Sequence, residues 1–154
     1  MIAPEPFCDS CGMVRENHNI DSIRSIYSAF TRGDIPGILS CMDESIVFIV
    51  PGAPSVPLAG VRRGLEQVEQ YYRELAHCIE YTLFEQRELI AQGNRVVALI
   101  HYEGRYKPGG GSFAVDSAML WTLGNGKALR FQEFTDTAAL VRAAGATGAV
   151  SDGR

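Results

Sequence analysis

Long apolar runs are missing from this chain of 154 residues, and so is any dense cluster of basic charge. No stretch approaches the ~20 apolar residues of a membrane-spanning helix, so we expect no membrane partner. Lys and Arg number 14 against 18 Asp and Glu, and their longest run is Arg62-Arg63. The formal net charge of −4 argues against a nucleic acid partner, because neutralising phosphates requires a basic surface.

We expect no secretory leader either. The opening segment, MIAPEPFCDSCG, has neither a basic stretch nor an apolar core. Hydrophobic residues make up 46% of the chain and charged residues 21%, an ordinary balance for a globular protein. The length is close to the ~100–150 residues of a single domain. We therefore expect one soluble, cytoplasmic domain.

Cysteine is scarce, with four in the whole chain. Cys8 and Cys11 form a C-x-x-C pair, a spacing that occurs in thiol-redox sites and in halves of zinc sites. No second pair follows, and this one lies beside prolines rather than at a strand-to-helix turn. We expect neither a metal nor another cofactor, and a zinc or thiol-redox protein stays open as an alternative.

Three segments in the first half have apolar residues spaced three and four apart, the pattern of amphipathic helices. These predicted helices cover about 19–33, 34–42 and 65–79. Residues 1–18 show little periodicity and are predicted to be a tail. Proline and glycine are concentrated in 51–60, which predicts a loop.

Strands dominate the rest of the sequence. An unbroken β-branched and aromatic run predicts a buried strand, and three glycine-rich turns separate four longer strands. A short helix is predicted over 136–145, the domain proper over 19–142, and a small-residue tail over 143–154. Short loops make neighbouring strands antiparallel, so the fold class is α+β. The predicted strands are 46–50, 81–91, 95–106, 112–123 and 128–135.

Four short motifs resemble the SnoaL-like branch of the NTF2-like superfamily, which includes polyketide cyclases, ketosteroid isomerase and limonene-epoxide hydrolase. They are FTRGD at 30–34, GVRRG at 60–64, GK at 126–127 and FQEFTD at 131–136. The resemblance covers about 19–142. It implies an NTF2-like (cystatin-like) cone, in which three N-terminal helices pack on a strongly curved antiparallel sheet and enclose a pocket. It also implies a homodimer.

Acid–base residues of these families carry over only in part. Ketosteroid isomerase has a catalytic Asp on its first strand, and the matching position here is near Ile49, in a run without acids. Limonene-epoxide hydrolase has a carboxylate seven residues after the Gly of the Gly-Lys turn, which corresponds to Glu133. His101 and Asp116 resemble the His and Asp that cyclases place on neighbouring strands. A steroid-isomerase reaction is therefore excluded, and the other two chemistries stay open.

The residues themselves favour the same catalytic set. Alternation places Glu133 on the more apolar face of its strand, beside Phe131, where burial would raise the pKa of its carboxyl. His101 is the only histidine in the predicted sheet, and Asp116 interrupts a strand in which aspartate is disfavoured. Each also has a plain structural interpretation, as a solvent-facing, core or edge residue. Aromatic residues of the apolar stripes are predicted to form the pocket wall: Tyr27, Phe48, Tyr72, Tyr102, Trp121 and Phe131.

These observations predict an enzyme that performs general acid–base chemistry without a cofactor on a small apolar substrate. Epoxide opening, cyclisation or isomerisation of a polyketide- or terpenoid-like molecule would fit. Glu133 would protonate the leaving oxygen, and His101, oriented by Asp116, would act as the base. The alternative is a non-catalytic module that binds a small ligand in the same pocket and dimerises.

Overall fold

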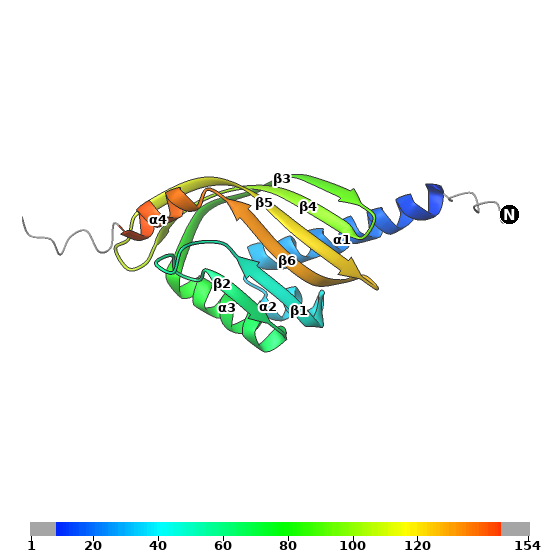
Figure 1. Ribbon diagram of the computed structural model, residues 1–154, viewed down its shortest axis with the longest axis horizontal. Helices are drawn as coiled ribbons and strands as arrows, with labels where there is room; N and C mark the ends of the chain where they lie inside the picture. Colours follow the sequence, from blue (N-terminus) through cyan, green and yellow to red (C-terminus); the bar gives the residue numbers. More distant parts are fainter. Residues whose placement is uncertain (1–8, 146–154) are drawn as a thin grey trace, which may run out of the picture.

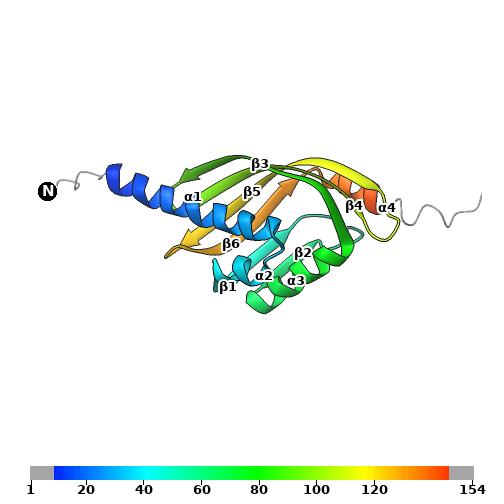
Figure 2. The same cartoon turned by 180° about the vertical axis from the view of Figure 1, so that it is seen from behind.

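Six strands form one curved sheet in the order β2-β1-β6-β5-β4-β3 in the computed structural model, which describes residues 9–145 (Figure 1). Helices α1, α2 and α3 cover the concave face of this sheet, and α4 lies at one end of it (Figures 1 and 2). The helices are α1 (Asp9–Thr31), α2 (Ile35–Ser40), α3 (Leu65–Cys78) and α4 (Thr137–Gly145). The strands are β1 (Met42–Val50), β2 (Gly60–Arg63), β3 (Ile79–Gln92), β4 (Arg95–Tyr106), β5 (Ser112–Gly124) and β6 (Lys127–Thr135).

The predicted α+β class is confirmed, but the described part of the chain has four helices, not three N-terminal ones. The helix at the C-terminal end of the domain agrees with the prediction over 136–145. Helix α1 begins at Asp9 instead of Asn19, so part of the predicted N-terminal tail is helical. The first half of α1 has no apolar stripe because it makes few contacts with the rest of the protein. Met13 and Val14 are exposed, and Asn19 is the first buried residue of the described helix.

The sheet is mixed, which corrects the purely antiparallel prediction. Strand β1 runs parallel to β6, with Phe48 opposite Phe131, and joins the end of the sheet away from the β3–β4 hairpin. Strand β2 is an additional strand, because its residues were predicted to form a loop and the start of a helix. It pairs with β1 through only four residues, all exposed or half-buried. Sequence neighbours make hairpins, whereas the β1–β6 pairing joins segments far apart in the chain.

Strand β3 contains a bulge that decides which of its side chains face the helices. Tyr81 pairs with Gly104 of β4 and Leu83 pairs with Glu103, so Thr82 is the additional residue. The extra residue resets the two-residue alternation, because Tyr81 and Phe84 both become half-buried while Leu83 is exposed. The bulge thus brings two aromatic rings to the inner face.

The core between helices and sheet is aromatic. The rings of Phe48 and Phe131 stack with their centroids 4.2 Å apart, and Trp121 lies 4.6 Å from Phe131. Trp121 and Phe48 are each 1% exposed.

None of the helices in residues 9–145 is both long and apolar enough to span a membrane.

Candidate functional site

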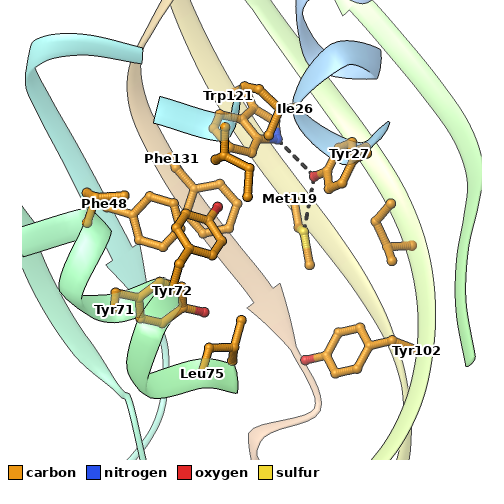
Figure 3. Packing of buried hydrophobic residues seen from close by; sticks show 14 of the residues in the cluster. Ile26, Tyr27, Phe48, Tyr71, Tyr72, Leu75, Tyr102, Met119, Trp121 and Phe131 are labelled. Atoms are coloured by element: carbon orange, nitrogen blue, oxygen red, sulfur yellow. Dashed lines mark hydrogen bonds between the residues drawn. The ribbon is translucent and has the colours of Figure 1, made fainter. Parts of the chain in front are cut away.

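A cavity of about 50 Å³ lies between α1, α3 and the inner face of the sheet (Figure 3). Its wall is almost entirely aromatic and aliphatic, and one carboxylate, that of Glu133, reaches it. The residues that line it are Ile26, Tyr27, Phe30, Phe48, Tyr71, Tyr72, Leu75, Tyr81, Phe84, Tyr102, Met119, Trp121, Phe131 and Glu133.

The six aromatic residues predicted as the pocket wall all meet at this cavity. They come from α1, β1, α3, β4, β5 and β6, so the fold gathers them from six elements. That they bind a substrate stays a prediction. Tyr81 and Phe84 also line the cavity but were not predicted, because two residues three apart on a strand share a face only where a bulge intervenes.

Glu133 is held by two hydroxyl groups from neighbouring strands. The hydroxyl of Tyr102 on β4 donates to its Oε1 at 2.8 Å, and Ser117 Oγ on β5 donates to the same oxygen at 2.9 Å. Ser117 Oγ also lies 3.4 Å from the carbonyl oxygen of Phe134. Ser117 was missed by the sequence analysis, although it alternates on β5 with the buried Met119 and Trp121.

Both donors converge on one oxygen, which leaves Oε2 of Glu133 without a hydrogen bond to any described residue. In this part of the chain, no fully buried polar side-chain atom lacks a partner, so Oε2 adjoins accessible space. Burial raises the pKa of the Glu133 carboxyl, and the bonds from Tyr102 and Ser117 offset that rise only in part. A raised pKa favours the protonated acid, with its proton on the free oxygen.

A second polar chain lines the same cavity. Trp121 Nε1 donates to the hydroxyl of Tyr27 at 3.0 Å, and that hydroxyl donates to Met119 Sδ at 3.2 Å (Figure 3). Burial also raises the pKa of the Tyr27 hydroxyl, so it stays neutral. These two bonds fix the ring of Tyr27, one of the wall residues supplied by α1.

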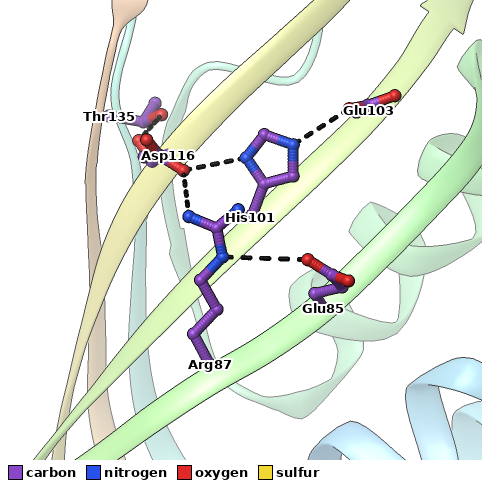
Figure 4. Close-up of polar contacts among 6 residues, drawn as sticks. All are labelled: Glu85, Arg87, His101, Glu103, Asp116 and Thr135. Atoms are coloured by element: carbon purple, nitrogen blue, oxygen red, sulfur yellow. Dashed lines mark hydrogen bonds and ion pairs between the residues drawn. The ribbon is translucent and has the colours of Figure 1, made fainter.

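His101 and Asp116 lie together, but on the outer face of the sheet (Figure 4). His101 Nδ1 is 2.8 Å from Asp116 Oδ1, and its Nε2 is 3.0 Å from Glu103 Oε1. The expected His–Asp pair therefore exists, whereas the expected meeting of His101 with Glu133 does not. Alternation along β4 is the reason, since His101 points outward and the adjacent Tyr102 points to Glu133.

The charge state of His101 follows from its two partners. Ionised carboxylates only accept hydrogen bonds, and a neutral imidazole has a single N–H, so satisfying both requires the imidazolium. The bonds to Glu103 and then Asp116 raise the pKa of His101, and His101 in turn lowers the pKa of Asp116. Arg87 Nη1 also contacts Asp116 Oδ1, at 3.1 Å. An imidazolium cannot accept a proton, so this arrangement disfavours His101 as a general base.

Only one cysteine of the C-x-x-C pair lies within the described residues. Cys8 lies outside the described residues, and Cys11 is exposed on α1. Within 9–145, no three His, Cys, Asp or Glu side chains are grouped as a metal would require. The described geometry thus gives the zinc or thiol-redox alternative no support.

Solved structures with the same fold come from several bacteria. An NTF2-like protein from Burkholderia xenovorans is 31% identical with a TM-score of 0.77, and the match covers 84% of this chain and 97% of that one. TerC, co-crystallised with polyporic acid, is 27% identical with a TM-score of 0.72, over 82% of this chain and 98% of its own.

Sequence comparison leads to the same group. An uncharacterised protein of Mycobacterium tuberculosis is 27% identical over 119 residues, which is 77% of this chain and 89% of that protein. The profile of the SnoaL-like domain matches residues 23–131, from the first buried isoleucine of α1 to the middle of β6. The chain therefore belongs to the SnoaL-like domain family and has the NTF2-like fold.

Proposed function

We propose that this protein is an enzyme that uses Glu133 as a proton donor to a small, largely apolar substrate whose reacting oxygen reaches the inner cavity. The observation that carries the proposal is that the two oxygens of the Glu133 carboxyl group differ in their hydrogen bonds. Tyr102 and Ser117 hold Oε1, while Oε2 is unbonded and adjoins accessible space. Burial raises the pKa of this carboxyl, which favours the protonated form that a general acid needs.

The cavity wall defines the substrate class. Aromatic rings from α1, α3 and the sheet surround Glu133, which favours a substrate that is apolar except for an oxygen that accepts the proton. TerC, a relative of known structure, was co-crystallised with polyporic acid. An oxygenated, polyketide-like molecule fits the lining of this cavity.

The reaction would be epoxide opening, cyclisation or isomerisation. Glu133 protonates the oxygen that gains charge as the bond to it breaks, and the carboxylate left behind accepts the proton of the attacking water or hydroxyl group. One residue then acts first as acid and afterwards as base. This scheme needs no base on the outer face, and His101 and Asp116 have no part in it. A step of this kind contributes about 10²–10⁴-fold to the rate.

Turnover of a panel of epoxides and cyclisation precursors tests the proposal. Glu133→Gln keeps the shape of the side chain but removes its titrating proton, so it should reduce kcat by about 10²-fold or more. Glu103→Gln makes the same change on the outer face and should leave kcat unaltered. Equal kcat for wild type and Glu133→Gln on a turned-over substrate would contradict the proposal.

The non-catalytic alternative predicts a different outcome. In a binding module, Glu133→Gln would change affinity only, and no member of the panel would be turned over by the wild type. Substitutions of the apolar wall, such as Phe131→Ala, would then weaken binding without any effect on a rate.

We also propose that two copies of the chain associate through the outer face of the sheet. Phe134 follows Glu133 on β6, faces outward and is 52% exposed beside the polar residues around Asp116. Sedimentation analysis should show a dimer for the wild type and a larger monomer fraction for Phe134→Glu. A monomeric wild type at micromolar concentration would contradict the proposal.

A further inference from the structure

A second, larger hollow of about 450 Å³ lies next to the inner cavity. It is bounded by the C-terminal end of α1, by α2, by the end of α3 and by the first residues of β3. Thr31, Ala76 and Thr82 are exposed residues of its rim, and Ile38 is a buried residue of its floor. The hollow therefore opens to solvent on one side and reaches the core on the other.

Five residues line both spaces and so form the partition between them. They are mainly aromatic: Phe30, Tyr72, Leu75, Tyr81 and Phe84. The ring centroids of Phe30 and Phe84 are 4.8 Å apart, and those of Phe30 and Tyr81 are 5.7 Å apart. Tyr81 and Phe84 owe their places in the partition to the bulge at Thr82.

The two spaces complement each other in size. A cavity needs about 10–15 Å³ to hold a single water, so the inner cavity of about 50 Å³ admits only a few atoms. Ligand sites commonly measure ~300–1,000 Å³, a range that the outer hollow reaches and the inner cavity does not. The acid is in the small space, and the room for a ligand is in the large one.

Two hydroxyl groups in the partition are free to bind a ligand. The hydroxyls of Tyr72 and Tyr81 make no hydrogen bond to any described residue. No fully buried polar atom in residues 9–145 lacks a partner, so both hydroxyls adjoin accessible space. Burial raises the pKa of each, which keeps them neutral donors at physiological pH.

We propose that the hollow and the inner cavity form one elongated binding site, which takes a neutral aromatic ligand of at least two rings with a hydroxyl or keto group on the inner ring. The ligand arrives through the rim at Ala76, displaces the rings of the partition, and places its oxygen among Tyr72, Tyr81 and Glu133. Its outer ring remains in the hollow. This inference rests on the proposed function only for the role of Glu133.

The test uses biphenyl-4-ol as the elongated probe and phenol as its single-ring counterpart. Trp121 is the sole tryptophan of the chain and lines the inner cavity, so its emission reports whether the probe reaches that space. We expect calorimetry to show biphenyl-4-ol binding at least tenfold more tightly than phenol, with a change in Trp121 emission at the same midpoint.

Ala76→Phe fills the rim of the hollow without adding a tryptophan, and it should weaken binding of biphenyl-4-ol at least tenfold. Ala53→Phe is the matched control, because Ala53 is an exposed alanine in the loop after β1 that lines neither space. It should bind the probe as the wild type does. Thermal melting of both variants shows that they remain folded.

Three results would overturn the inference. Unchanged affinity in Ala76→Phe means that the ligand does not use the hollow, and equal affinity for phenol means that the site is not elongated. Binding without any response of Trp121 means that the probe stays in the hollow. Each concerns the extent of the site, whereas the proposed function fails separately, through equal turnover by Glu133→Gln.

Discussion

His101 and Tyr102 are adjacent in β4, yet their side chains belong to different sites on opposite faces of the sheet. The Tyr102 hydroxyl donates to the buried Glu133, and the His101 ring contacts Asp116 and Glu103 on the outer face. The sheet thus separates an apolar cavity that contains one acid from an outer polar cluster in which two carboxylates raise the pKa of His101. The two sites should respond differently to mutation, to pH and to salt.

The outer cluster should make stability depend on pH. The pKa of His101 is raised from its ordinary value of 6.5, so its contribution is fully present below that pH and is lost as pH rises through the folded pKa. Melting temperature followed upward from pH 6.5 should therefore fall less in His101→Asn than in the wild type. Asp116→Asn should reduce the fall in part. Identical slopes in wild type and His101→Asn would contradict the assignment.

Salt distinguishes the two faces. The Asp116 side chain is 76% exposed, so its interactions with His101 and Arg87 are open to screening. Raising the ionic strength should shrink the pH effect due to His101 and leave that of the buried Glu133 nearly unchanged.

The hydrogen bond between Trp121 and Tyr27 should contribute measurably to stability. Tyr27→Phe leaves the buried Trp121 N–H without its acceptor, which should lower the free energy of unfolding by ~1–3 kcal/mol. Tyr72→Phe is the control, because the Tyr72 hydroxyl has no partner among the described residues, and it should cost less. Urea denaturation measures the free energy of unfolding of both variants. Equal losses in the two would contradict the stabilising role of the hydrogen bond between Trp121 and Tyr27.

Gly104 should tolerate no side chain, because β4 approaches β3 closely next to the bulge. A Cβ there would lie 2.6 Å from the carbonyl oxygen of Glu80, so one strand would have to move. Gly104→Ala should cost about 1–3 kcal/mol of stability. Gly12→Ala meets open space on α1 and should be neutral or stabilising, since alanine favours helix. A neutral Gly104→Ala in urea denaturation would show that the strands are free to separate there.

Alternation correctly predicted that Phe131 and Glu133 are buried, because they share a face that is clearly more apolar than the other. It failed to orient β4, whose first half is apolar on both faces: Val96 and Ala98 point inward, and Val97 and Leu99 point outward. A sequence in which both faces are apolar does not say which one holds His101. The outward position follows from pairing with β5, a long-range contact.

The elements that sequence analysis missed are those without a local signal. The first turns of α1 are exposed, and β2 has four residues and no alternation that marks a buried face. The bulge at Thr82 and the parallel β1–β6 pairing depend on register between strands. The place of Tyr81 beside the inner cavity depends on the bulge, so it became visible only in three dimensions.

Buried Glu133 should also make stability fall with pH, in a range set by its own shift. The pKa of Glu133 is raised above the ordinary 4.5. The stability that its protonated carboxyl contributes is therefore fully present below pH 4.5 and is lost as the pH rises through the pKa of the folded state. Thermal melting from pH 4.5 upward should show this fall in the wild type. Glu133→Gln should flatten it, while Glu103→Gln should not.

The central claim is that Glu133 is a buried acid with a raised pKa, and titrating this one carboxyl by carbon-13 NMR tests it most directly. Comparison of the wild type with Glu133→Gln assigns the resonance. We predict a titration midpoint above 4.5, raised by the desolvation of the carboxyl among aromatic rings. A midpoint at or below 4.5 would mean that Glu133 is ionised near neutral pH, and the general-acid role would be contradicted.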